Sequence, residues 1–269
     1  MMIKAISKYL AFLALMLLTF SLKAGDEFCG IKNTAFKNGE VVTMKIFYTT
    51  LGMYIGAGEA TFSATMEKYN GKTSYHCVGE GKTYSFFDNF FRVRDKYETY
   101  IDSATMLPMK FIRNVQEGGT KIYNNVTFNH KGGTAVSTNG VFKVTPCIQD
   151  VISSVYYARN INFDKYKAGD QIPYDMFIDD QVYHLHITYI GKETIKTKYG
   201  RFRAIKFNPL LLKGTVFQGG EGMAVWVSDD PNHLILRIES AISVGSVKID
   251  MMGYRNLRYP LTSLISFKQ

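Results

Sequence analysis

Short runs of β-branched and aromatic residues, separated by turn residues, recur along almost the whole chain after residue 38. Such residues favour strands, whereas Gly, Asn and Asp favour the turns between them. Two of the runs flank Asn70-Gly71, the strongest short hairpin signal, because both residues tolerate a positive φ. The chain is therefore predicted to be mainly β, with strands at 39–49, 57–68, 73–79, 90–101, 109–115, 121–128, 171–178, 181–190, 200–208, 222–228, 234–240 and 246–252.

The segment 90–101 has two different faces. Positions 92, 94, 96 and 98 are all charged, whereas the alternate positions are mainly apolar. A period of two with one polar face predicts a half-buried antiparallel strand. Asp95 is the exception, because it shares the apolar face with Val93 and Tyr97. If that face lies in the core, Asp95 must be paired with an Arg or Lys or hydrogen-bonded, and a polar anchor in a ligand cavity is the other reading. Asp95 is therefore a candidate ligand-binding residue.

One segment has the periodicity of a helix. Apolar residues recur at 148, 151, 152, 155 and 156, which lie on one helix face. Thr145-Pro146 is typical of a helix start, with Thr as the N-cap and Pro at the first helical position. Arg159 follows near the C-terminal end, where positive charge is favoured. We predict one α-helix near residues 146–159, packed on the sheet.

Nothing in the sequence divides the strands into separate units, because no Pro-, Gly- or Ser-rich linker interrupts them. A sheet of about ten or more strands must curl or split. We therefore expect residues 25–269 to form a single β-rich domain. Its fold class is mainly β, with one large, strongly curved antiparallel sheet and the helix against it.

The first segment has the features of an export signal. Lys4 and Lys8 precede an uncharged apolar run of about 14 residues, shorter than the roughly 20 of a typical membrane span, and Ala24 ends a small-residue cleavage site. We expect residues 1–24 to be a signal peptide, with an uncleaved N-terminal anchor as the alternative. No later segment is long and apolar enough for a transmembrane helix. The mature protein is thus expected in the periplasm or associated with the outer envelope.

Export makes disulfides possible, and the chain has three cysteines without a Cys-x-x-Cys spacing. Cys77 lies in a strand-like run and is predicted to be a buried, small apolar residue. Cys29 lies in an irregular leader and Cys147 at the expected helix start. We predict a disulfide between Cys29 and Cys147, which would tie the leader to the helix. Three free thiols are the alternative.

No catalytic motif is recognisable. The chain lacks the Gly-x-Ser-x-Gly of serine hydrolases, and the end of a phosphate loop at 79–83 lacks its first glycine, because His76 occupies that position. His184 and His186 would point to one side of a strand, as metal ligands can, but no third ligand has a diagnostic spacing. We predict no catalytic residue, no metal and no cofactor, and therefore a protein that is not an enzyme.

Basic residues gather on two strand faces, at Arg92, Arg94 and Lys96 and at Arg201 and Arg203. In an envelope protein such faces could meet anionic lipid headgroups, and the alternative is an ordinary solvated face. Nucleic acid is not an expected partner outside the cytoplasm.

Several motifs, taken in order, resemble a known family. They are Ala-Phe-Lys-Asn-Gly-Glu at 35–40, Ala-Gly-Glu-Ala at 57–60, the strand at 92–102, Leu107-Pro108 and Trp-Val-Ser-Asp-Asp at 226–230. Together they resemble the exported bacterial proteins grouped as domain of unknown function 3108, over about residues 36–260. The resemblance implies a Gram-negative envelope protein. It also implies a fold similar to the periplasmic lipoprotein carriers (LolA/LolB-like), an incomplete barrel with a hydrophobic concave side, and it carries over no catalytic residue.

These observations favour non-enzymatic binding of an apolar ligand, a lipid or a lipoprotein acyl chain, in the concave side of the sheet. Aromatic residues make up 14% of the chain, and apolar β-cavities are common ligand sites. A solid core would argue against this function. The alternative is a structural or assembly factor of the cell envelope without a small ligand, which would show an exposed apolar patch or an unpaired sheet edge.

Overall fold

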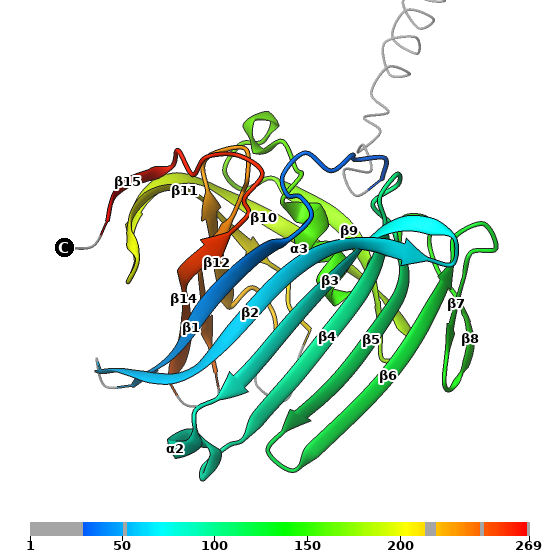
Figure 1. Ribbon diagram of the computed structural model, residues 1–269, viewed down its shortest axis with the longest axis horizontal. Helices are drawn as coiled ribbons and strands as arrows, with labels where there is room; N and C mark the ends of the chain where they lie inside the picture. Colours follow the sequence, from blue (N-terminus) through cyan, green and yellow to red (C-terminus); the bar gives the residue numbers. More distant parts are fainter. Residues whose placement is uncertain (1–28, 51–52, 213–218, 243–244, 268–269) are drawn as a thin grey trace, which may run out of the picture.

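The computed structural model describes residues 29–50, 53–212, 219–242 and 245–267, so the expected signal peptide lies outside the described residues. Within these ranges the chain forms one antiparallel sheet of 15 strands that curves around helix α3 without closing (Figure 1). This confirms the predicted fold class. The strands are β1 (Glu40–Thr50), β2 (Met53–Tyr69), β3 (Lys72–Thr83), β4 (Val93–Asp102), β5 (Pro108–Glu117), β6 (Thr120–Asn129), β7 (Thr134–Ser137), β8 (Gly140–Lys143), β9 (Gln171–Ile178), β10 (Gln181–Lys196), β11 (Gly200–Pro209), β12 (Met223–Ser228), β13 (Ile235–Ala241), β14 (Ser246–Arg255) and β15 (Leu264–Phe267). The helices are α2 (Ser85–Asp88), α3 (Val151–Ala158) and the 3-10 helix η2 (Phe163–Lys165).

The sheet is built almost entirely from hairpins. Each strand from β1 to β8 pairs with the next, as does each strand from β9 to β14, and β1 joins the two series by pairing with β14. The predicted hairpin is confirmed, because β2 and β3 meet at Asn70 and Gly71, whose φ angles are 48° and 77°. β15 lies off this path and pairs with β11.

Helix α3 begins later than predicted, at Val151 instead of near residue 146. Residues 146–147 form a turn, and Gln149 then pairs with the outer edge of β9. Because its backbone groups bond to β9, Gln149 cannot form the hydrogen bonds of a longer helix. Asp150 is the N-cap in place of Thr145. Its side chain accepts hydrogen bonds from the backbone of Ile152 and Ser153, and the Ser153 hydroxyl accepts one from the Asp150 N–H. This reciprocal capping box fixes the start of the helix.

Helix α3 fills part of the concave side, where it packs against β3, β4 and β9 (Figure 1). Ile152 and Tyr156 belong to one buried cluster with Phe36 and Cys77. Cys77 is fully buried and free, as predicted from its surroundings. The sheet approaches the helix closely at Gly79, where a Cβ atom would come within 3.0 Å of the Ile152 side chain. Within the described residues, no helix is long and apolar enough to cross a membrane.

Arg159, at the C-terminal end of α3, forms a buried ion pair with Glu40 at the start of β1. The two side chains are 5% and 1% exposed, and an Arg159 Nη2 to Glu40 Oε2 hydrogen bond measures 3.0 Å. Arg159 also donates two hydrogen bonds to the Asn232 carbonyl, at 3.1 and 3.0 Å. The pair therefore fastens the helix to the strand that joins the two series of hairpins and to the turn before β13.

Candidate functional site

The inner side of the sheet extends past α3 along β4 and β5. The Thr99 hydroxyl marks this side, because it donates a hydrogen bond of 2.6 Å to Asp150 at the start of the helix. Residues two and four positions away on one strand share a face, so Tyr97 and Asp95 also point inward. Asp95 therefore lies on the core-facing side of β4, which is the face that the sequence pattern assigns to it. The charged residues Arg94 and Lys96 lie on the outer side.

Asp95 is half-buried and forms a pair with another carboxyl group, that of Glu117 at the end of β5. Its Oδ1 atom also accepts a hydrogen bond of 3.2 Å from the Gln116 N–H. Burial and the neighbouring charge of Glu117 raise the pKa of Asp95 to about 7, and burial raises the pKa of Glu117 as well. The pair therefore retains one proton below about pH 7. Within the described residues, no Arg or Lys forms an ion pair with Asp95.

A buried arginine lies beside this pair. Arg113, directly across from Tyr97, donates hydrogen bonds to Asn124 and forms an ion pair with Asp179. Its positive charge lowers the pKa of Glu117 and so opposes part of the effect of burial. In the hydrogen bond between the two groups, the protonated Asp95 carboxyl thus donates and the Glu117 carboxylate accepts. Such a pair can donate a hydrogen bond to a ligand or accept one from it.

Open space adjoins Asp95 on the inner side. Gly81 on β3 pairs directly with Asp95, and a Cβ atom at Gly81 would meet no atom within 4 Å. Directly opposite residues of an antiparallel pair project to the same face of the sheet. A ligand group could therefore lie over Gly81 and reach the Asp95 carboxyl.

Apolar side chains that are only partly buried lie at the margin of the main core cluster. Burial raises the pKa of Tyr97 and raises that of Tyr174 to about 12. Partly exposed apolar groups together with a few polar ones are the usual lining of ligand sites. The set comprises Ile31, Phe62, Tyr75, Tyr97, Tyr166, Tyr174, Met223, Ile235 and Ile238.

The part of the concave side that α3 covers is packed. A cavity of about 10 Å³ remains there, which is room for about one water molecule. An acyl chain cannot enter this space. The residues around the cavity are Val42, Phe62, Val155, Tyr156, Arg159, Leu234 and Ile235.

The other residues considered in the sequence do not assemble into a site. His184 and His186 lie on β10, but each contacts its own acid, Asp175 at 2.6 Å and Glu221 at 2.9 Å. Where the chain is described, no three metal-ligating side chains come together. The glycine-rich residues 79–83 are part of β3 and therefore extended strand.

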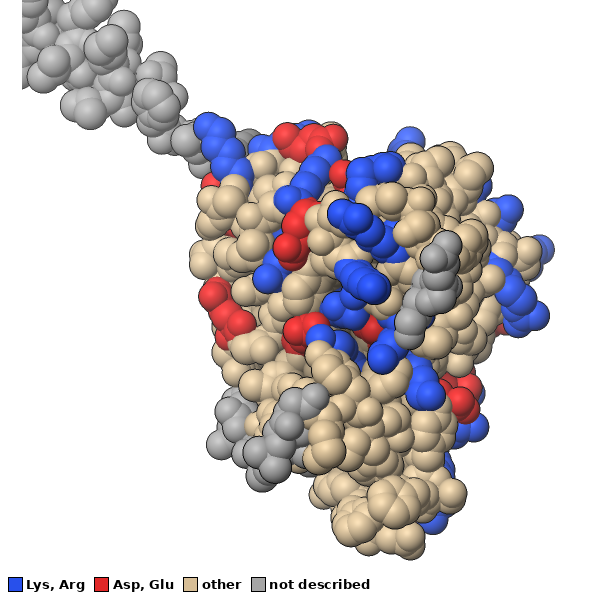
Figure 2. Space-filling view, turned by 90° about the vertical axis from the view of Figure 1, so that its left-hand side faces the viewer, with Lys and Arg blue, Asp and Glu red and all other residues tan. Residues whose placement is uncertain are grey.

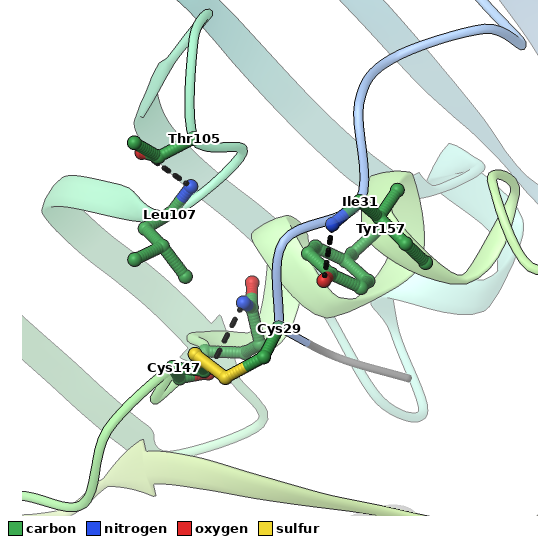
Figure 3. The surroundings of a disulfide bond; sticks show 7 residues. Cys29, Ile31, Thr105, Leu107, Cys147 and Tyr157 are labelled. Atoms are coloured by element: carbon green, nitrogen blue, oxygen red, sulfur yellow. Dashed lines mark hydrogen bonds between the residues drawn. A yellow bond between two sulfur atoms is a disulfide. The ribbon is translucent and has the colours of Figure 1, made fainter. Parts of the chain in front are cut away.

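The sulfur atoms of Cys29 and Cys147 are bonded, and their Cα atoms are 5.4 Å apart. Figure 3 shows the bond beside the start of α3, where it holds the leader against the turn that precedes the helix. A second link lies in the last turn of α3, where the Tyr157 hydroxyl accepts a hydrogen bond of 3.2 Å from the Ile31 N–H. The leader thus lies fixed over the helix that fills the concave side.

Comparison with known proteins places the chain among proteins without an assigned activity. Residues 42–252 match the family described as protein of unknown function (DUF3108), in agreement with the resemblance seen in the sequence. No curated protein matches the chain.

Three solved structures match the chain to different degrees. The crystal structure of a β-barrel-like protein of domain of unknown function DUF1849 from Brucella abortus is 7% identical, with 83% of this chain and 98% of that chain covered and a TM-score of 0.52. A protein provisionally called a lipoprotein, from Parabacteroides distasonis, is 10% identical, with 83% and 100% covered and a TM-score of 0.34. A protein provisionally called exported, with a YmcC-like fold, from Bacteroides fragilis is 11% identical, with 84% and 99% covered and a TM-score of 0.32. Of these, the Brucella structure shows a shared fold, and the other two are too dissimilar to show one.

Proposed function

This chain belongs to the DUF3108 family, and we propose that it is a non-enzymatic protein of the bacterial envelope that binds a lipid or a lipoprotein acyl chain on the concave side of its sheet. The observation that carries the proposal is the contact between the Asp95 and Glu117 carboxyl groups, with the pKa of Asp95 raised to about 7, beside the open space at Gly81. A ligand that is mostly apolar, with one hydroxyl or carboxyl group, matches this arrangement.

The position of the ligand follows from the packing of α3. Because the space next to the helix holds about one water molecule, an acyl chain would lie on the inner face beyond the helix, over β3 and β4. There its head group would hydrogen-bond to Asp95, and its chain would cover the partly buried rings of Tyr75 on β3 and Tyr97 on β4. Each buried methylene group would contribute about 0.8 kcal/mol.

Two features favour binding over catalysis. Cys77, the free thiol in the described part of the chain, is fully buried, and burial raises its pKa well above the usual range, so that it is a poor nucleophile. Asp95 and Glu117 bond to each other, which leaves neither carboxyl paired with a nucleophile that it would activate.

Placement in the envelope rests on the sequence and the cysteines. The expected signal peptide at 1–24 would direct export, and a Cys29–Cys147 disulfide suits an oxidising compartment. The continuous sheet supports one domain over residues 25–269, since no pair of separate sheets divides the described residues.

Titration of the purified mature protein with a fluorescent fatty acid tests the proposal. The Gly81→Leu substitution would fill the open space, and we expect it to weaken binding at least tenfold, because the side chain would occupy the ligand's place. Gly222→Leu is the matched control, since a Cβ atom at Gly222 also meets nothing within 4 Å but the residue precedes β12 and lines a separate cavity of about 290 Å³, where a loss of binding would place the ligand instead. Equal affinities for the two variants, or no binding by the unsubstituted protein, would contradict the proposal.

The second candidate function is a structural or assembly factor of the envelope. Exposed apolar side chains favour it, in particular Phe86 and Phe90 near α2 and Val141 on β8. A protein that binds no fatty acid but is captured by an envelope protein through these side chains would have this function.

A further inference from the structure

The outer side of the sheet around β1 and β14 carries lysines that lie over aromatic rings. Lys45 Nζ is 5.5 Å from the centre of the Phe47 ring, and Lys198 Nζ is 5.7 Å from the same ring. Lys198 and Lys248 both lie over Tyr54, at 5.7 and 4.8 Å. These three lysines and two rings are called the lysine band below. Their ammonium groups are held at the surface by cation–π contacts.

The positive charge of the lysine band is only partly balanced. Lys248 pairs with Glu239 at 2.7 Å, but among the described residues no carboxylate lies within ion-pair distance of Lys45 or Lys198. Figure 2 shows the side of the molecule that carries β1, β14 and β15, with Lys and Arg gathered through its centre. On the basic face of β4, by contrast, Lys96 pairs with Glu98 at 3.1 Å and Arg94 with Asp88 at 2.6 Å.

Next to the lysine band, the segment around α2 projects as an apolar tip. Phe86 and Phe90 are 65% and 75% exposed, and their ring centres are 5.5 Å apart. The tip is nevertheless fixed in place. Asp88 accepts hydrogen bonds from Thr83 at 2.5 Å and from Arg94 at 2.6 Å, and the Arg94 bond holds the pKa of Asp88 below its usual range.

One residue connects the tip to the band. Tyr84 directly precedes α2, and its backbone N–H donates to the Ala57 carbonyl at 2.9 Å. Lys45 Nζ is 6.0 Å from the centre of the Tyr84 ring and also lies over Phe47. The lysine band and the apolar tip therefore form one continuous surface.

We propose that this surface docks the protein on an anionic lipid membrane, with Phe86 and Phe90 inserted among the lipids and the lysine band over the headgroups. Aromatic residues and lysines with apolar stems are the side chains that favour a membrane interface, and each basic residue near an anionic surface strengthens binding. A stable protein partner would need about 800 Å² of complementary surface on each side. Two phenylalanines on a projecting tip do not supply this area, whereas a lipid surface needs no matching shape.

Co-sedimentation of the mature protein with lipid vesicles tests the docking surface independently of fatty acid binding. We expect binding to vesicles that contain phosphatidylglycerol and much weaker binding to pure phosphatidylcholine. Lys45→Gln with Lys198→Gln should lower the partition coefficient on anionic vesicles about 25-fold, at about fivefold per lysine. Phe86→Ser with Phe90→Ser should lower it at least tenfold on the same vesicles.

Matched controls come from elsewhere on the outer side. Lys110→Gln removes a lysine that lies 5.9 Å from the Tyr69 ring and is compared with Lys45→Gln alone, for which a fivefold loss is expected. Val136→Ser with Val141→Ser removes exposed apolar groups at the β8 edge. Both control variants should bind vesicles as the unsubstituted protein does, and circular dichroism should show all variants folded. No binding to anionic vesicles, or equal losses in the control variants, would overturn the proposal. The proposal would also be overturned if the protein did not bind vesicles but captured a protein partner through Phe90.

Discussion

The carboxyl pair makes the stability of this protein depend on pH in an unusual direction. The pKa of Asp95 is about 7 in the folded protein and near its usual 3.8 in the unfolded chain. The folded state thus binds the additional proton between these values. The contribution of this proton to the free energy of unfolding is fully present below about pH 4 and is lost as the pH rises through about 7.

The size of the effect follows from the same shift. Three pKa units correspond to about 4 kcal/mol, and screening by solvent at this half-buried position reduces the value to about 2 kcal/mol. Asp95→Asn imitates the protonated side chain and can still donate to Glu117. The variant should match the unsubstituted protein at about pH 4 and should exceed its free energy of unfolding by about 2 kcal/mol at about pH 8.

Urea unfolding at several pH values measures this difference. Asp150, whose pKa burial raises to about 6, contributes in the same direction but is present in both proteins and cancels. Glu59→Gln is the control, because Glu59 is exposed and pairs with Lys82 at 2.9 Å at the surface. A constant difference between the Asp95→Asn variant and the unsubstituted protein across the pH range, or a variant that is less stable at about pH 8, would refute the reasoning.

Three further substitutions test the links that hold α3 in the concave side. Arg159→Met should lower the free energy of unfolding by about 3–5 kcal/mol, because it leaves the Glu40 carboxylate buried and unpaired, and adding Glu40→Leu should restore most of the loss. If the double variant in urea unfolding is as unstable as the single one, the buried pair is not the cause. Cys147→Ser should cost about 2–4 kcal/mol, because the bond to Cys29 closes a loop of 118 residues, and a reducing agent should lower the midpoint of the unsubstituted protein alone. An equal response of both proteins would exclude the disulfide. Asp150→Ala should lower the thermal midpoint by removing the helix cap, at a cost of about 2 kcal/mol, and an unchanged midpoint would contradict this role.

Twelve of the 15 strands were predictable because each carries its own signal, whereas the four-residue strands β7, β8 and β15 were not predicted. Alternation along residues 90–101 fixes which side faces inward, and Asn70-Gly71 fixes a turn, so neither depends on distant residues. The start of the helix was not predictable, because two local signals compete for it. Pro146 is the stronger signal, and the Asp150–Ser153 capping box is the weaker one. The structure selects the capping box because Gln149 pairs with the edge of β9 and is therefore not available to a helix.

The candidate site was predictable only in part. The inward position of Asp95 follows from one strand, but its partner Glu117 lies two residues beyond the predicted end of the next strand and meets Asp95 only through the register of β4 and β5. The pairing of Glu40 with Arg159 spans 119 residues, and no local pattern marks it. Contacts of this kind depend on how the sheet curves, which a single sequence does not specify.

Mass spectrometry of lipids that remain bound to the natively purified protein tests the central claim most directly. The proposal predicts a lipid or acylated ligand with the unsubstituted protein, its loss from the Gly81→Leu variant, and its retention by the Gly222→Leu control. An unsubstituted protein that carries no lipid and binds no fluorescent fatty acid would contradict the claim and favour the role of an assembly factor.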